Sequence, residues 1–311
     1  MTFTDLLAKN AFFVSLVLMK RALFFLVILP CVFFLSFLIT QSFGLKGLKW
    51  MKKEEERFSA APFPLKHKPF TILVVAHNNG AFVEKTLSSI FSQCYDNFRL
   101  IYIDDASNDG SFELARDRIY ESDHLAHVTL VKNEERLGLL ANIYRAALSC
   151  PDDEILVPLD AEDWLAHEWV LEKLNAYYDD PSLWLCLAQG MHYPTYKCAP
   201  RPDFTEARFQ KQNEAHLKSF YAALFKKIEE KDLVRQGSFL PSCAELAYLS
   251  PMLEMAKEHA FFTKDVLCIH NAQKTKQEDQ ALVEQCESFI RDTKPYSSLT
   301  SLQVFECGEL F

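Results

Sequence analysis

Three carboxylates directly follow an apolar run, and they are the residues of this chain best suited to chemistry. The segment 154–159 reads EILVPL, and Asp160, Glu162 and Asp163 come next. Like charges this close destabilise one another, and a divalent cation with oxygen ligands is the usual remedy. The pattern therefore predicts a metal site. A solvated acidic helix N-terminus is the alternative, because the helix dipole favours carboxylates in the first turn.

Two more polar clusters follow apolar, strand-like runs. The run 70–76 (FTILVVA) ends at the turn residues 77–80 (HNNG), and the run 99–103 ends at Asp104 and Asp105. Ordinary turn formation is the alternative explanation for the first cluster, and helix capping for the second. Three such clusters at consecutive strand ends are harder to explain in this way than any one alone.

The elements that must position these clusters alternate along the chain. Apolar runs typical of buried strands are separated by segments with apolar residues at helical spacing. Strands are expected near 70–76, 99–103, 128–131 and 155–159, and helices near 82–94, 112–120 and 139–149. This alternation predicts an α/β fold in which a parallel sheet has helices on both faces. In such sheets ligands bind beyond the carboxyl ends of the strands, so the three clusters are expected to share one site.

The N-terminal part of the chain has a different character. Residues 22–40 contain no charged side chain, and a helix of this length approaches the thickness of about 30 Å of a bilayer core. The run is longer than the apolar part of a cleaved signal peptide, and no small-x-small site follows it. We expect residues 1–45 to form a membrane anchor with one transmembrane helix, and residues 46–67 a juxtamembrane linker.

Flanking charges and cysteines favour a cytosolic location for the remaining domain. Basic residues stand on both sides of the apolar span in nearly equal number, so the positive-inside rule gives only a slight preference. The nine cysteines are an odd set without a C-x-x-C pair, so neither a disulfide framework nor a structural zinc site is indicated. They are typical of a reducing compartment.

The overall charge limits the possible ligands. The formal net charge is −9, which argues against nucleic acid as a partner. An anionic substrate would need local positive charge, and this again indicates a bound metal.

Several motifs in order make the chain similar to a known family. The segment 70–111 (FTILVVAHNNGAFVEKTLSSIFSQCYDNFRLIYIDDASNDGS), then RLGLLANIYRAAL, then ILVPLDAEDWL, resemble the family 2 glycosyltransferases of GT-A fold. This resemblance runs from about residue 70 to residue 190. The segments 216–220 (HLKSF), 245–254 and 266–271 are similar to the C-terminal half of a bacterial, membrane-anchored branch of that family.

The resemblance implies a Rossmann-like mixed sheet and roles for the polar clusters. In such enzymes the first two strand ends hold the base and ribose of a nucleotide-sugar. The matching residues here are Ala76, Asn78, Asp104, Asp105 and Asn142.

The D-x-D-type motif of the family carries the metal and ribose contacts. It maps onto Asp160, Glu162 and Asp163, and a histidine late in the chain, here His270, supplies a further ligand in some GT-A folds. The expected cofactor is Mg²⁺ or Mn²⁺. Glu162 stands where the family more often has aspartate, and a polar strand boundary is the alternative explanation for His270.

The reaction that the resemblance implies needs a general base. Family 2 enzymes invert the anomeric carbon in one displacement, and a carboxylate takes the proton from the acceptor hydroxyl. Glu245 occupies the matching place, where an aspartate is usual in this branch. A charged residue in the first turn of a helix is the alternative interpretation.

Other segments near the expected site have structural interpretations. The spacing of apolar residues predicts a helix over 216–228 that carries His216. The segment 193–204 has three prolines and is expected to be a loop, and its basic residues, together with Arg208, are interpreted as solvated. Trp164 and Trp169 flank the acidic cluster; core packing in a helix is favoured over stacking on a sugar.

The sequence thus supports three interpretations. The preferred one is a metal-assisted inverting glycosyltransferase, at the cytosolic face of a bacterial inner membrane, that moves a sugar from a UDP-type donor to a glycan or lipid-linked acceptor of the cell envelope. A non-catalytic relative that binds nucleotide or glycan is the second, and a sugar-phosphate nucleotidyltransferase the third. Residues 68–190 would hold the donor and residues 191–311 the acceptor.

Overall fold

The computed structural model describes residues 66–200, 208, 216–273 and 279–304. The chain divides into two compact units, Met1–Pro64 and Leu65–Phe311, and the described residues belong to the second. The predicted transmembrane helix at 22–40 lies outside the described residues. Within the described part, no helix combines the length and apolar character needed to cross a bilayer.

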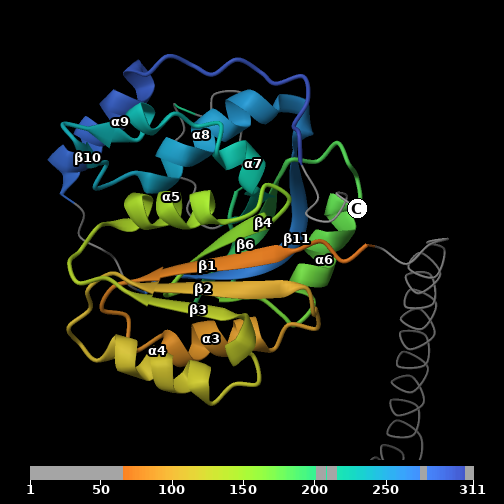
Figure 1. Ribbon diagram of the computed structural model, residues 1–311, viewed down its shortest axis with the longest axis vertical. Helices are drawn as coiled ribbons and strands as arrows, with labels where there is room; N and C mark the ends of the chain where they lie inside the picture. Colours follow the sequence, from red (N-terminus) through yellow and green to blue (C-terminus); the bar gives the residue numbers. More distant parts are fainter. Residues whose placement is uncertain (1–65, 201–207, 209–215, 274–278, 305–311) are drawn as a thin grey trace, which may run out of the picture. The chain divides into compact units, whose positions relative to one another are not determined.

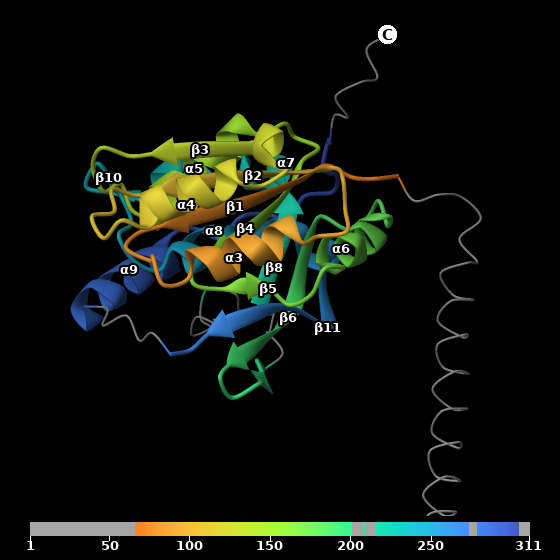
Figure 2. The same cartoon turned by 90° about the horizontal axis from the view of Figure 1, so that it is seen from below.

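The described strands form one large mixed sheet of nine strands with the order β3-β2-β1-β4-β8-β6-β11-β5, and β7 pairs with β6 (Figures 1 and 2). These strands are β1 (Phe70–Ala76), β2 (Phe98–Asp104), β3 (Val128–Lys132), β4 (Ile155–Asp160), β5 (Trp164–Leu165), β6 (Leu185–Tyr193), β7 (Lys197–Cys198), β8 (His216–Tyr221) and β11 (Ala260–Asn271). Strands β3, β2, β1 and β4 are parallel, β8 is antiparallel to both β4 and β6, and β6 is parallel to β11. A small hairpin, β9 (Val234–Arg235) and β10 (Ser238–Phe239), lies apart from this sheet.

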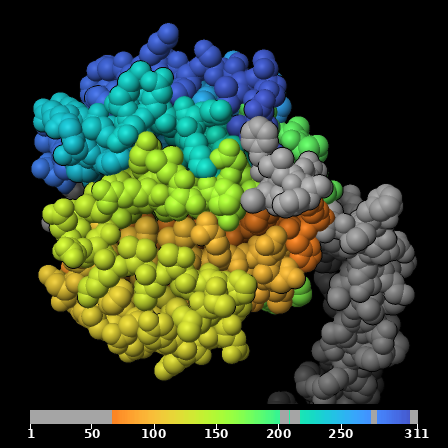
Figure 3. Space-filling model, in the orientation of Figure 1, coloured from red at the N-terminus to blue at the C-terminus, as the bar shows by residue number. Residues whose placement is uncertain are grey.

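Helices cover both faces of the sheet, as the alternating pattern predicts. On one face lie α3 (Val83–Phe91), α4 (Ser111–Tyr120) and α6 (Val170–Tyr178), and on the other α5 (Leu139–Ser149), α7 (Ala222–Phe225), α8 (Ala244–Ala256) and α9 (Gln280–Asp292) (Figure 1). Each face has its own apolar core, because successive side chains of a strand point to opposite sides. In the space-filling view the earlier segments of the domain and the later ones cover separate areas of the surface (Figure 3).

Within the first half of the domain, all seven predicted elements are present within a few residues of their expected ends. Helix α3, for example, buries Val83, Leu87 and Ile90 along one stripe, as the spacing indicates. The predicted helix over 216–228 is wrong in its first part, where residues 216–221 form the strand β8 and only 222–225 are helical. In β8, Leu217 and Phe220 belong to opposite cores, so the apolar residues reflect a strand buried on both faces.

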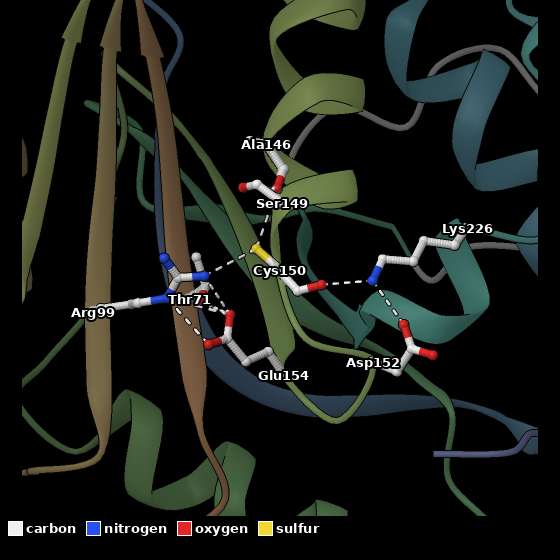
Figure 4. Close-up of polar contacts among 8 residues, drawn as sticks. All are labelled: Thr71, Arg99, Ala146, Ser149, Cys150, Asp152, Glu154 and Lys226. Atoms are coloured by element: carbon white, nitrogen blue, oxygen red, sulfur yellow. Dashed lines mark hydrogen bonds and ion pairs between the residues drawn. The ribbon is translucent and has the colours of Figure 1, made fainter. Parts of the chain in front are cut away.

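A polar cluster closes the amino ends of β1, β2 and β4 (Figure 4). Glu154 accepts a hydrogen bond from Thr71 Oγ1 (2.6 Å) and forms an ion pair with Arg99 (2.7 Å), whose guanidinium also contacts Cys150 Sγ (3.3 Å). Burial raises the pKa of the Cys150 thiol to about 11, so this sulfur stays protonated and acts as a packing residue. The cluster ties the strands together at the end opposite to their carboxyl ends.

Candidate functional site

The carboxyl ends of β1, β2, β4, β6 and β11 lie along the same edge of the sheet. Strands β4 and β6 point the same way because each is antiparallel to β8 between them. The three polar clusters predicted from the sequence therefore occupy one edge, together with the end of β11. This is the edge at which open α/β sheets bind ligands.

Asp105 organises the loop that leads into α5. Its Oδ1 accepts hydrogen bonds from Asn133 Nδ2 (2.8 Å), the Leu137 N–H (2.9 Å) and Asn142 Nδ2 (2.9 Å), while Oδ2 accepts from the Gly138 N–H (2.9 Å). Burial opposes the charge of this carboxyl, but these four donors outweigh it and lower the pKa of Asp105. The carboxylate is thus a fixed anchor for the segment 133–142.

Asn142 belongs to the same network. Its amide nitrogen donates to Asp105 and to the Gly138 carbonyl (2.9 Å), and its oxygen accepts from Asn133 (2.9 Å). The side chain is buried, so it lies behind the loop rather than on its surface. Contacts of Asp105 and Asn142 with a nucleotide remain predictions.

The loops after β1 and β2 are tied together. The Asn78 N–H donates to Ser107 Oγ (3.0 Å), and Asn78 Oδ1 accepts from the Asn108 N–H (2.9 Å). Asp104 points away from Asp105 and is fully buried, with Oδ1 accepting from the Ser107 N–H (3.0 Å). Ala76 is buried too, and its carbonyl accepts from the Asp105 N–H (2.7 Å). The hydrogen bonds of Ala76, Asn78, Asp104 and Asp105, all predicted to contact the nucleotide, thus hold the loops at the carboxyl ends of β1 and β2 in place.

The acidic turn after β4 is held from the α3 side. Thr86 Oγ1 donates to the carbonyls of Ala161 (3.1 Å) and Asp163 (2.8 Å), and the Asp163 N–H closes the turn onto the Asp160 carbonyl (2.9 Å). The Asp160 residue is exposed, whereas Glu162 and Asp163 are buried. The alternative of an acidic helix N-terminus is wrong, because residues 164–165 form the strand β5.

Asp163 connects this turn to the end of β11. Its Oδ1 accepts from the Asn271 N–H (2.9 Å), and its Oδ2 forms a hydrogen bond with His270 Nδ1 (3.1 Å). Burial raises the pKa of Asp163 and neighbouring Asp160 raises it further, although the bond to His270 opposes this. The same hydrogen bond raises the pKa of His270 above its ordinary value. The structure thus brings together two residues that are far apart in the sequence.

Glu245 reaches the same region from the first turn of α8. Its Oε1 accepts a hydrogen bond from Lys218 Nζ (2.5 Å), and the Glu245 side chain is 30% exposed while that of Lys218 is 6% exposed. Burial raises the pKa of Glu245, against the attraction of Lys218, and the charges of Asp160 and Asp163 raise it further. Sequence reasoning missed Lys218; the available signal was a charged residue in the middle of an apolar, strand-like segment.

The donor groups suit a hard cation, although they do not form a closed cage. The Asp163 carboxylate contacts the His270 imidazole, and Asp160 lies in the same turn as Asp163. Among the described residues no group of three or more His, Cys, Asp or Glu side chains is arranged to hold a metal by itself. Mg²⁺ commonly uses one or two carboxylates and completes its coordination with substrate phosphates, so the donor chemistry fits.

Residues beside the acidic turn depart from their expected settings. Trp164 is in β5 rather than in a helix, and the Lys85 ammonium lies 3.3 Å from the centroid of its ring. Trp169 is half exposed at the start of α6.

Arg208, predicted from the sequence to be solvated, is buried in the structure. Its guanidinium pairs with Glu254 and donates hydrogen bonds to the carbonyls of Ile290 and Thr293.

This combination of a mixed sheet, helices on both faces and a polar carboxyl edge defines a GT-A-like nucleotide-sugar transferase fold. The crystal structure of S. aureus TarS 1–349 has this fold, with a TM-score of 0.51 and 13% sequence identity over 72% of this chain and 70% of that chain. The complex of the same protein with UDP-GlcNAc gives a TM-score of 0.50 with 14% identity over 67% of this chain and 60% of that chain. The resemblance in structure is one of fold.

The sequence model described as glycosyl transferase family 2 matches residues 71–232, and the chain belongs to this family. Among curated relatives, an uncharacterized glycosyltransferase of Haemophilus influenzae is 28% identical over 110 residues, which are 35% of this chain and 32% of the relative. Glycosyltransferase GlyA of Streptococcus pneumoniae is 27% identical over 126 residues, which are 40% of this chain and 16% of the relative. The matches thus span about a third or less of these relatives.

Proposed function

We propose that this protein is a membrane-anchored inverting glycosyltransferase that moves a sugar from a nucleoside diphosphate donor to a glycan or lipid-linked acceptor of the bacterial cell envelope. Family membership and the fold support the transferase class. A UDP-sugar is the proposed donor, in line with the UDP-GlcNAc bound by TarS. The observation that carries the proposal is that Glu245, from α8, is held by Lys218 of β8, the strand that pairs with β4 and its acidic turn.

The residues of the carboxyl edge divide between the two substrates. The loop 133–138, fixed by Asp105, lies beside the first two strand ends and is proposed to border the nucleoside. Asp160 is the exposed carboxylate of the acidic turn and would contact the ribose and diphosphate end of the donor. Glu245, partly exposed across the site, is proposed to accept the proton of the acceptor hydroxyl as that oxygen attacks the anomeric carbon.

Asp163, Glu162 and His270 are proposed to hold a divalent cation together with the diphosphate oxygens. Bound there, Mg²⁺ or Mn²⁺ would act as a Lewis acid that stabilises the charge of the departing diphosphate. His270 and the Asn271 N–H keep the Asp163 carboxylate in a fixed orientation, which is what a ligand on a rigid strand end requires.

The proposed location follows from the uncharged segment 22–40, which is long enough to span a bilayer once. A single anchor would keep the domain close to a lipid-linked acceptor. The slight excess of basic residues after the segment, and the odd set of cysteines without a C-x-x-C pair, favour a cytosolic domain.

The test is nucleotide binding by the full chain in detergent. UDP, GDP, CDP and dTDP are titrated by calorimetry with and without Mn²⁺, and release of nucleoside diphosphate from the corresponding sugar nucleotides is then measured. We expect UDP to bind with Mn²⁺, and Asp163→Asn to weaken binding about tenfold or more. Asp179→Asn, an exposed aspartate at the end of α6, is the matched control.

Each result has a distinct meaning. Binding of no nucleotide by the folded chain would refute the proposal. Nucleotide binding without release from any sugar nucleotide would instead support a non-catalytic relative. Formation of pyrophosphate from a sugar phosphate and a nucleoside triphosphate would identify a nucleotidyltransferase.

A further inference from the structure

Lys218 is a buried cation that pairs with Glu245. It lies in β8, the strand between β4 and β6, on the face that packs against α8. Burial opposes the charge of its ammonium, but attraction to Glu245 and Asp160 outweighs this, so the pKa of Lys218 is raised. The group is therefore a permanent positive charge.

The ion pair is asymmetric in a way that matters for Glu245. Lys218 contacts Oε1, and no described residue donates a hydrogen bond to Oε2. The lysine is sealed behind the site with 6% exposure, while the glutamate reaches its rim with 30% exposure. The carboxylate is thus held through one oxygen, and the other oxygen remains able to accept a proton from a ligand.

The ordinary explanation is that the pair ties β8 to α8. An ion pair of this kind contributes little net free energy to folding, because the cost of removing the two charges from water offsets much of their attraction. This structural role also does not explain why Lys218 is almost fully buried while the Glu245 side chain stays 30% exposed.

We infer that Lys218 is a positioning residue that holds the Glu245 carboxylate through Oε1 and leaves Oε2 to receive the proton of the acceptor hydroxyl. The inference rests on the proposed function and deepens it. No group is transferred to the lysine. The acceptor hydroxyl loses its proton to Glu245 Oε2 as its oxygen bonds to the anomeric carbon, and the bond to the diphosphate breaks.

The experiment compares Lys218→Met with Lys226→Met in the full chain in detergent. Lys226 forms a similar pair with Asp152 (2.7 Å), but at the opposite edge of the sheet (Figure 4). Two quantities are measured for each: the Kd of UDP with Mn²⁺, and the kcat of UDP release from a panel of UDP-sugars with a bacterial glycolipid extract as acceptor. Lys218→Met should lower kcat about 100-fold, the contribution of a general base, and leave the Kd of UDP within about threefold. Lys226→Met should change neither.

Two further variants keep the inference testable if Lys218→Met folds poorly. Lys218→Arg retains the cation and should keep more activity than Lys218→Met, though less than wild type because its fork has a different shape. The double variant Lys218→Met with Glu245→Gln leaves no unpaired buried charge and should be no slower than Glu245→Gln alone, since the lysine acts through the glutamate.

The outcomes separate the inference from the proposed function. A wild-type chain that binds no UDP, or binds it without turnover, removes both. An active wild type with equal kcat in the two lysine variants overturns the inference alone. Two results would show that Lys218 has only a structural role. One is a double variant whose loss in kcat is the product of the losses in the two single variants. The other is a kcat of Lys218→Met that falls only in proportion to the folded fraction seen in thermal melts.

Discussion

Asp105→Asn is the substitution whose cost follows most directly from the structure. Four N–H groups donate to this carboxylate. A hydrogen bond to a charged group contributes about 1.5–3 kcal/mol, against about 0.5–1.5 kcal/mol for a neutral pair. Asparagine keeps one acceptor but places an amide NH₂ opposite the Gly138 N–H. One bond is therefore lost and three are weakened.

The expected destabilisation is smaller than the sum of these effects. Bonds that share one carboxylate do not contribute independently, and the exposed residues 134–136 allow the loop to relax. We expect the free energy of unfolding to fall by about 3 kcal/mol, which corresponds to roughly 6–12 °C in Tm for a domain of this size. The Leu137 and Gly138 amides should also exchange their hydrogens faster, because both donate directly to Asp105.

The assay is a thermal melt of the full chain in detergent, combined with hydrogen exchange. Asp179→Asn serves as the control, since this aspartate is exposed and should give an unchanged Tm and unchanged exchange in the loop. An Asp105→Asn protein with wild-type Tm and wild-type protection at Leu137 and Gly138 would refute the assigned role of the carboxylate.

Three further outcomes are expected. The pKa of Asp105 is lowered in the folded chain, so its charge stabilises the fold above the unfolded pKa of about 3.9, and this contribution is lost as the pH falls through the folded pKa. In denaturant titrations, the difference in stability between wild type and Asp105→Asn should therefore shrink below about pH 4. A difference that stays constant with pH would contradict this. Gly138→Ala should lower the free energy of unfolding by about 1–3 kcal/mol, because the φ angle of Gly138 is +88°, although there is space for a Cβ atom. Gly80→Ala should lower it less, because Gly80 has no positive φ. Equal Tm values for the two variants would count against backbone strain at Gly138. Glu154→Gln should cost about 1–3 kcal/mol in urea unfolding, because it leaves the partly buried Arg99 without its carboxylate, and a loss below about 0.5 kcal/mol would remove the cluster from the stabilising contacts.

The first half of the fold was predictable because its signals are local. The strands there are short, largely apolar runs, and helices such as α3 and α5 have an apolar stripe. The segment 216–228 gave a wrong helix because an apolar pattern of this length suits a helix and also a doubly buried strand followed by a helical turn. The partners that decide between them, β4 and β6, are distant in the sequence.

The candidate site was predictable as a set of residues but not as a set of contacts. The acidic turn and Glu245 were found from residue types and motif order, while the Lys218 pair depends on β8 entering the sheet beside β4. In the same way, the family motifs place Asp105 and Asn142 at one site, but the role of Asp105 as a loop anchor depends on direct hydrogen bonds from the segment 133–142 that the motifs do not specify.

Charge balance links the proposed cation to the structure. Three acidic residues, of which Asp160 is exposed, stand in the turn at the edge where a diphosphate would bind, although Lys218 pairs with Glu245 and the His270 imidazole hydrogen-bonds Asp163. A chain with a net charge of −9 offers no broad positive field to offset their repulsion. A nucleoside diphosphate would therefore need to bring positive charge with it. A divalent cation held at the acidic turn would meet this need, and a complete protein cage would not be required, because Mg²⁺ commonly completes its coordination with substrate phosphates.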